Sequence, residues 1–270
     1  MTEYTLDAAG YPYRIREEGS GFPVIWLHGM FHSLEVEEQF AVVDFSRLAA
    51  RFRLIRIELP AHGKSPVAAG AARLTWPSLA GDLINLAGQL QLERFFIGGF
   101  SQGAAIATHV ALQMPGRVAG LMLAMLPKIW DSRPEVRKTY SKVLGRLHDG
   151  NYRQVLSRLF ALNKYPPDFC VEEPTGMQQA IIQKMLDRPC EAFCQILKGA
   201  VESDFPDRAE VACLPLPAFM LAWENDANHP IESSLEVRAA LSRAELTVLT
   251  EKEAFLNASE RLEAFIFNNL

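Results

Sequence analysis

The sequence has little cysteine, no long apolar run and no excess of positive charge. Four cysteines in 270 residues are too few for a disulfide framework and fit free thiols in a reducing cytoplasm. No apolar run approaches the ~18 residues that cross a bilayer, and the first residues do not resemble a secretory signal. Lys and Arg number 27 against 32 Asp and Glu, which argues against nucleic-acid binding. We therefore expect a cytoplasmic protein that binds neither nucleic acid nor membrane.

Motifs for metals and nucleotides are also missing. The chain contains no HExxH motif and no Cys/His cluster, and the run from Gly98 to Gly103 lacks the spacing of a dinucleotide-binding loop. The adjacent Glu37 and Glu38 are expected on a solvated helix face. Neither a cofactor nor a metal is therefore predicted.

Short apolar runs alternate with helical patterns along most of the chain. The expected strands cover residues 11–17, 24–27, 52–59, 95–97, 118–123, 218–222 and 245–249. The expected helices cover residues 33–50, 75–90, 102–114, 136–147, 152–162, 177–186, 191–201, 231–241 and 257–267. Such alternation predicts an α/β fold with a mostly parallel, twisted sheet flanked by helices.

The alternation stops between Pro127 and Asp207, where only helical stretches are expected. We therefore predict an α/β core made of residues 1–126 and 208–270. Residues 127–207 would form a helical cap, or lid, over the carboxyl edge of the sheet, where ligands bind in open α/β sheets.

The segment most informative about chemistry is Gly99-Phe100-Ser101-Gln102-Gly103, between an apolar strand and an alanine-rich helix. A nucleophile on a sharp strand-to-helix turn needs small neighbours, because side chains at positions 99 and 103 would strike the turn. The turn would hold the Ser101 hydroxyl above the sheet, at the positive end of the following helix. The backbone N–H of Gln102 would then face a developing oxyanion.

These motifs resemble the α/β-hydrolase superfamily, and the resemblance covers almost the whole chain. Leu27-His28-Gly29-Met30 is similar to its oxyanion loop, which implies a second oxyanion N–H at Met30 and a place for His28 beside the substrate. The run from Glu58 to Ser65 resembles the family's DxxGxGxS turn, with Glu58 in place of Asp. The family's cap follows its sixth strand, which implies the same insertion point here.

The resemblance also implies an acid after the strand at 218–222. Asp226 matches that position, and Glu224 is a weaker choice. The predicted cap is rich in aromatic and aliphatic side chains, which indicates a pocket for a medium-sized, largely apolar acyl or ring group. Phe100 and Trp130 are the expected walls, since both would lie near the strand ends.

The expected general base is missing. The family places a histidine after the last strand, and that position falls on Ala254. Three explanations stay open: a His→Ala substitution that inactivates an enzyme, a natural non-catalytic member, or a base recruited from elsewhere. His229 is the histidine near the acid, although a surface histidine before Pro230 is the simpler interpretation.

The sequence therefore predicts a serine hydrolase of an ester, thioester, lactone or C–C bond, inactive as written if Ala254 replaces the base. It would act on a small molecule, as a monomer or homodimer. The alternative is a ligand-binding protein or receptor on the same scaffold.

Overall fold

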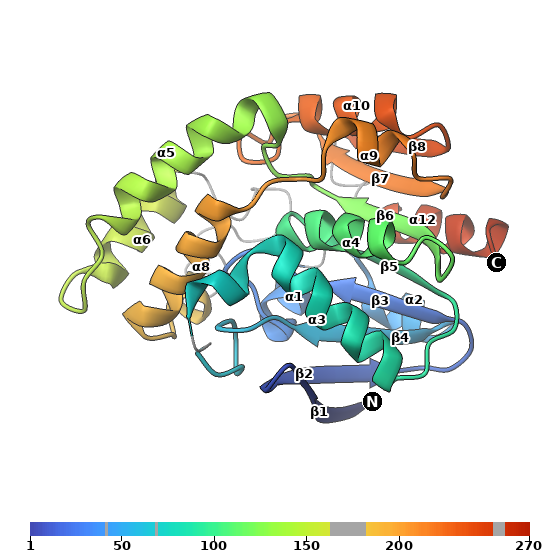
Figure 1. The fold of residues 1–270 in the computed structure, drawn as a ribbon, viewed down its shortest axis with the longest axis horizontal. Helices are drawn as coiled ribbons and strands as arrows, with labels where there is room; N and C mark the ends of the chain where they lie inside the picture. The colour runs from blue at the N-terminus through green and yellow to red at the C-terminus, as the bar shows by residue number, and fades with distance from the viewer. Residues whose placement is uncertain (41–42, 68–69, 163–181, 251–256) are drawn as a thin grey trace.

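An eight-stranded sheet forms the centre of the molecule (Figure 1). The computed structural model describes residues 1–40, 43–67, 70–162, 182–250 and 257–270. The strand order is β1-β2-β4-β3-β5-β6-β7-β8. The strands are β1 (Thr2–Ala8), β2 (Tyr11–Glu18), β3 (Pro23–Leu27), β4 (Arg53–Glu58), β5 (Phe95–Phe100), β6 (Val118–Ala124), β7 (Ala218–Trp223) and β8 (Ala244–Leu249). From β4 to β8 the neighbours pair in parallel, which confirms the predicted mostly parallel sheet.

The antiparallel edge contains a strand that the sequence analysis did not predict. β1 pairs with β2 from Thr2 opposite Glu17 to Ala8 opposite Tyr11, and β2 pairs antiparallel with β4. Tyr4, Leu6 and Ala8 of β1 are more buried than the residues between them, so the strand carries the alternation of a half-buried edge strand, which was not recognised in the sequence.

Helices cover both faces of the sheet (Figure 1). Outside the predicted cap they are α1 (Leu34–Phe40), α2 (Phe45–Ala49), η1 (Ala71–Leu74), α3 (Trp76–Gln89), α4 (Gln102–Gln113), α9 (Arg208–Ala212), α10 (Ile231–Ala240) and α12 (Ala258–Asn268). The single helix expected over residues 33–50 is wrong, because α2 has its own start. There the Asp44 carboxylate accepts a hydrogen bond from the N–H of Arg47 at 3.1 Å, as an N-cap.

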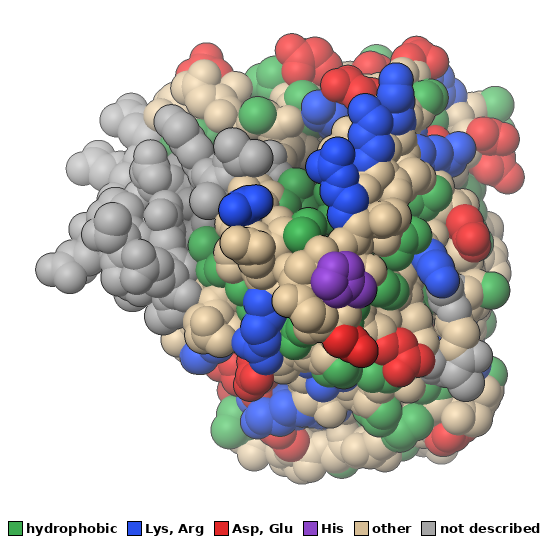
Figure 2. All heavy atoms as spheres, turned by 90° about the vertical axis from the view of Figure 1, so that its left-hand side faces the viewer, with side chains coloured by type: hydrophobic (Ala, Val, Ile, Leu, Met, Phe, Trp, Pro, Cys, Tyr) green, Lys and Arg blue, Asp and Glu red, His purple; other side chains and the backbone are tan. Residues whose placement is uncertain are grey.

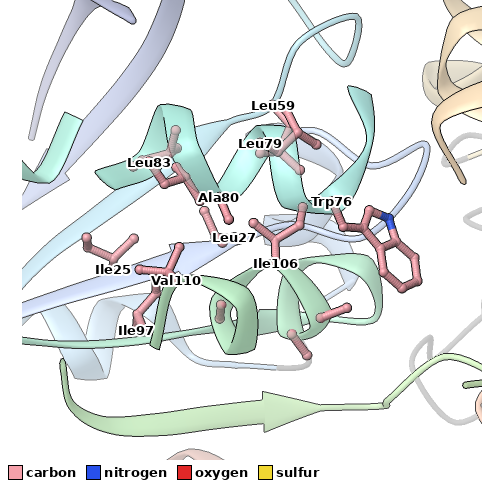
Figure 3. Packing of buried hydrophobic residues seen from close by; sticks show 14 of the residues in the cluster. Ile25, Leu27, Leu59, Trp76, Leu79, Ala80, Leu83, Ile97, Ile106 and Val110 are labelled. Atoms are coloured by element: carbon pink, nitrogen blue, oxygen red, sulfur yellow. The ribbon is translucent and has the colours of Figure 1, made fainter. Parts of the chain in front are cut away.

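Two apolar clusters hold these layers together, one on each face of the sheet. Figure 3 shows the first: Leu79 and Leu83 of α3 and Ile106 of α4 pack against Ile25 and neighbouring strand residues. On the other face, side chains of α2 and α12 cover the strands. The burial of apolar surface in these two clusters is the main contribution to the stability of such a fold.

The cap elements lie between β6 and β7, as predicted for an insertion after the sixth strand. They are η2 (Trp130–Ser132), α5 (Arg133–Leu144), α6 (Tyr152–Leu162) and α8 (Cys190–Glu202). In Figure 1 these helices lie beyond the ends towards which the parallel strands run. Of the helix expected at 177–186, the first half lies outside the described residues, and residues 182–185 are helical. The boundaries at 126/127 and 207/208 stay predictions.

Among the residues that the structure describes, no helix is long and apolar enough to cross a membrane. Three of the four cysteines fall in this part of the chain, and Cys190, Cys194 and Cys213 are all free.

Two glycines test how tightly the sheet and its helices pack. A Cβ at Gly81, on the outer face of α3, would meet nothing within 4 Å, whereas one at Gly98 in β5 would lie 2.1 Å from the Met122 carbonyl oxygen. Gly81→Ala should raise the free energy of unfolding by about 0.5–1 kcal/mol, because alanine restricts the unfolded chain. Gly98→Ala should lower it. Urea denaturation of both variants checks this, and equal effects would contradict the described packing.

Candidate active site

Ser101 occupies the turn between β5 and α4, in a conformation that side chains rarely adopt. Its φ is 53° and its ψ −113°, and it stands at the N-cap of α4. Its N–H donates to the Ala124 carbonyl at 2.9 Å, which ties the turn to the end of β6. A strained backbone of this kind persists only where the surroundings over-determine it, and such positions cluster at functional sites.

The glycines on either side of Ser101 allow this turn. A Cβ at Gly99 or at Gly103 would lie 2.3 Å from the Leu27 carbonyl oxygen at the end of β3. Only residues without a side chain permit β3 to approach the turn so closely. The steric demand inferred from the sequence is therefore present in the fold.

His229 meets the Ser101 hydroxyl from the other side of β6. Its Nε2 lies 3.0 Å from Ser101 Oγ, and its Nδ1 lies 2.6 Å from Asp226 Oδ2. The ring is 8% exposed. It is thus a buried ring between a carboxylate and a hydroxyl, and not the surface histidine of the simpler interpretation.

Asp226 is held by the loop between β7 and α10. Its Oδ1 accepts hydrogen bonds from the N–H groups of Asn228 at 2.8 Å and His229 at 3.1 Å. Burial by itself would raise the pKa of Asp226. The charge and hydrogen bond of His229, with the two N–H groups, outweigh burial and hold that pKa below its ordinary value of 3.8. The carboxylate is therefore ionised and oriented towards the imidazole.

The histidine position inferred from the resemblance, Ala254, lies within 251–256, outside the described residues. Position 254 was the expected place of the base, and His229 was a candidate for a recruited base, with a surface histidine as the simpler interpretation. A signal for His229 was present: it stands three residues after the acid in the same loop, and no histidine follows it in the chain.

A cavity of about 360 Å³ opens beside these side chains. Its described lining comes from the turns after β3, β5 and β7 and from the cap. The lining residues are Met30, Phe31, His32, Phe100, Ser101, Pro127, Lys128, Arg133, Glu135, Val136, Thr139, Tyr140, Leu159, Met185, Ala227, Asn228 and His229. Its volume suits a small organic molecule.

A second buried histidine lines this cavity and was not singled out from the sequence. The Nδ1 of His32 lies 2.9 Å from Glu37 Oε1, while Glu37 Oε2 accepts from Trp26 Nε1 at 2.7 Å. The His32 ring stacks on Phe100, and Phe100 meets His229 edge-on, both at 5.2 Å between centroids. The packing of Phe100 thus sets the position of both imidazoles.

The expectation that Glu37 faces solvent is wrong, because the side chain is 7% exposed. Burial would raise the pKa of Glu37, but hydrogen bonds and charge from His32, His28 and Trp26 lower it overall. A buried carboxylate thus supports the floor of the cavity.

Two of the expected substrate contacts lie outside the described cavity lining. His28 accepts from the Leu59 N–H at 2.9 Å through Nε2, and its Nδ1 lies 2.8 Å from the Gly29 carbonyl oxygen. Trp130 packs edge-on against Phe205 and donates from Nε1 to the Pro206 carbonyl at 2.8 Å. Both side chains therefore brace turns beside the cavity, because their polar atoms are used by the backbone.

The two residues expected to supply oxyanion N–H groups border the Ser101 turn. Met30 lines the cavity, and Gln102 is the first residue of α4. The first N–H groups of a helix have no partner within it, and the helix dipole is positive there. Among the described residues, no group of three His, Cys, Asp or Glu side chains is arranged to hold a metal.

Comparison with known proteins gives a family match over most of the chain. A model described as "Alpha/beta hydrolase family" matches residues 24–258. A pimeloyl-[acyl-carrier protein] methyl ester esterase of Aeromonas salmonicida is 25% identical over 74% of this chain and 75% of its own length. The AB hydrolase superfamily protein YisY of Bacillus subtilis is 23% identical over 93% of this chain and 92% of its own length.

A shorter match joins this chain to the sn-1-specific diacylglycerol lipase ABHD11 of Danio rerio. The two are 30% identical over 106 residues, which is 39% of this chain and 32% of the lipase. The match therefore spans about a third of that relative.

Solved structures resemble the whole molecule. A hydrolase from Pseudomonas aeruginosa PA01 aligns with a TM-score of 0.79 and 19% identity over 98% of this chain and 97% of its own. The enol-lactonase from Burkholderia xenovorans LB400 aligns with a TM-score of 0.77 and 19% identity, over 98% of this chain and 97% of its own. At this identity the likeness shows the fold alone.

The contact between Asp226 and His229 predicts a pH-dependent stability. A carboxyl whose pKa is lower in the folded than in the unfolded state stabilises the fold above its ordinary pKa. That contribution is lost as the pH falls through the lower, folded-state value. The difference in unfolding free energy between the wild type and Asp226→Asn should therefore be largest above about pH 5 and shrink towards about pH 3.

Urea denaturation at a series of pH values measures this difference. Asp149→Asn, in an exposed turn, controls for the loss of one carboxylate. A difference for Asp226→Asn that stays constant over the whole pH range would contradict the pairing.

Proposed function

Because the chain belongs to the alpha/beta hydrolase family, we propose that it is a serine esterase whose catalytic triad is Ser101, His229 and Asp226. Family membership and the esterases among its relatives support hydrolase activity in general. The observation that supports the triad is the unbroken series of contacts from Asp226 Oδ2 through the His229 ring to Ser101 Oγ, at 2.6 and 3.0 Å. Both distances lie within the range for a nucleophile and its base.

The proposed reaction begins with proton transfer. His229 Nε2 takes the proton of Ser101 while Oγ attacks the ester carbonyl, and Asp226 holds the other ring nitrogen as the N–H donor. The negative oxygen that forms is stabilised by the N–H groups of Met30 and Gln102 and by the N-terminus of α4. His229 then gives its proton to the departing alcohol, and water cleaves the acyl-enzyme by the same steps in reverse order.

The burial of Ser101 and His229 under the cap contributes to this chemistry. Their exposed fractions are 7% and 8%. Charges that develop in a site with little water interact more strongly with fixed dipoles than they do in bulk solvent. The proposal thus gives the cap a catalytic as well as a selective role.

The base assignment also changes the expected activity of the chain. The hypothesis of an inactive protein depended on a base at position 254, which is alanine. With His229 as the base, the chain as written needs no further histidine, and we expect it to be active.

Substitutions at residues 229 and 254 test which of these two positions provides the general base. His229→Ala and Ser101→Ala should each lower kcat for p-nitrophenyl butyrate by about 10⁴- to 10⁶-fold, as typical triad losses do. Ala254→His should change kcat by less than about tenfold. His148→Ala, at an exposed histidine, should leave kcat unchanged and serves as the control.

Steady-state kinetics with a circular dichroism check of folding measures these effects. A large gain from Ala254→His together with little loss from His229→Ala would move the base to residue 254. Hydrolysis that persists in Ser101→Ala would overturn the proposed function itself.

A further inference from the structure

Two basic residues form part of the cap wall of the cavity that contains Ser101 and His229. Lys128 follows β6, and Arg133 is the first residue of α5; both line the cavity. Within the described part of the chain, neither side chain has a carboxylate oxygen within 4.0 Å. Among the described residues, no ion pair within that distance neutralises the positive charge at this wall, although the Asp204 carboxylate, which pairs with Arg137 at 3.3 Å, acts on Arg133 from farther away.

Arg133 is fixed and buried. Its guanidinium donates to the carbonyl oxygens of Ser203 at 3.0 Å, Ala200 at 2.5 Å and Lys128 at 3.4 Å, and it stacks on Trp76 at 4.4 Å. The side chain is 2% exposed. Burial lowers the pKa of Arg133 from 12.5, but a guanidinium stays protonated in proteins. A permanent charge thus lies in a poorly hydrated region, where its field is weakly screened.

Lys128 is the more available of the two cations. The residue is half-buried and lines the cavity, and its backbone carbonyl oxygen accepts a hydrogen bond from Arg133. Glu135 is the one acidic residue in the described lining, and it is exposed, so solvent screens its charge. The cap wall therefore favours an anion.

The first part of the cap has the same sign. Residues 127–162 contain eight Lys or Arg against three Asp or Glu, whereas residues 127–207 as a whole are nearly balanced, with 12 against 11. Figure 2 shows the cap side of the molecule, where a group of Lys and Arg side chains runs diagonally down towards the centre of the view, with Asp and Glu side chains above it. A positive region around a cavity raises the local concentration of anionic ligands.

We propose that the cavity takes carboxylic esters that carry a second, ionised carboxylate, such as half-esters of short dicarboxylic acids, with Lys128 as the residue that binds this carboxylate. The inference depends on the proposed function and narrows its substrate class beyond an apolar acyl group. The distal carboxylate stays bound while Ser101 and His229 cleave the ester carbonyl. The products are an alcohol and a dicarboxylate, and water supplies the atoms that balance the reaction.

Matched substrates test the proposal. Monomethyl adipate carries the distal carboxylate, and dimethyl adipate has the same chain without the charge. A charge-assisted hydrogen bond changes affinity by about 10- to 100-fold. Lys128→Met should therefore raise KM for monomethyl adipate about 10- to 100-fold more than KM for dimethyl adipate. Added salt should weaken the preference for the half-ester.

Control variants separate the charge of Lys128 from general effects on the cap. Lys128→Arg should keep most of the preference for monomethyl adipate. Lys138→Met removes an exposed cation of α5 that does not line the described cavity, and it should leave the preference unchanged. Calorimetry with adipate and the Ser101→Ala protein measures anion binding without turnover, with weaker binding expected when Lys128→Met is added.

The outcomes distinguish this inference from the proposed function. Ser101-dependent hydrolysis of dimethyl adipate with no preference for the half-ester, and no effect of Lys128→Met, would overturn the anion site alone. Adipate binding that requires Lys128, without Ser101-dependent hydrolysis of either ester, would support the anion site and overturn the esterase proposal. Adipate binding unaffected by Lys128→Met would overturn the assignment of Lys128.

Discussion

The close approach of the β5–α4 turn to the end of β3 is the constraint on which the site depends. The Leu27 carbonyl oxygen lies where side chains at positions 99 and 103 would otherwise project. This contact holds Ser101 in the left-handed region and directs its hydroxyl into the cavity. The Ser101 N–H, bonded to Ala124, fixes the same turn to β6. The backbone of Ser101 is therefore positioned by the packing of this turn, and its hydroxyl then meets His229 Nε2 at 3.0 Å.

Parallel strands bring the other parts of the site to this turn. β5, β6 and β7 are neighbours, so the loops after β5 and β7 emerge at one edge although they are more than a hundred residues apart in sequence. His229 and Asp226 reach Ser101 because of that register. The cap closes over this edge and is tied to the core by Arg188, which donates to the carbonyl oxygens of Ala61 at 3.2 Å and Gly63 at 2.9 Å.

Buried charges stabilise the loops on the β3 and β4 side of the cavity. Glu58 is fully buried and accepts hydrogen bonds from the N–H groups of Lys64 at 2.8 Å and Ser65 at 3.0 Å, with Arg14 at 3.1 Å. It takes the role that the resemblance assigned to an aspartate in this turn. Because each buried carboxylate has several donors, moving one loop would leave a charge unpaired in the interior, at a cost of several kcal/mol. These networks therefore favour a rigid arrangement of the loops beside the cavity.

Local features were predictable from the sequence by itself: the alternation of strands and helices, the helical insertion after the strand at 118–123, and the Gly-x-Ser-x-Gly turn. Each depends on residues close together along the chain. The β1 strand was missed although Tyr4, Leu6 and Ala8 alternate there with more exposed residues. The helix over residues 33–50 was drawn too long because Asp44 was not recognised as a cap. The contact of His229 with Ser101, the burial of Glu37 and the cations of the cavity wall were decided by tertiary structure. They join residues far apart in sequence, and only the stacking of parallel strands under a cap brings those residues together.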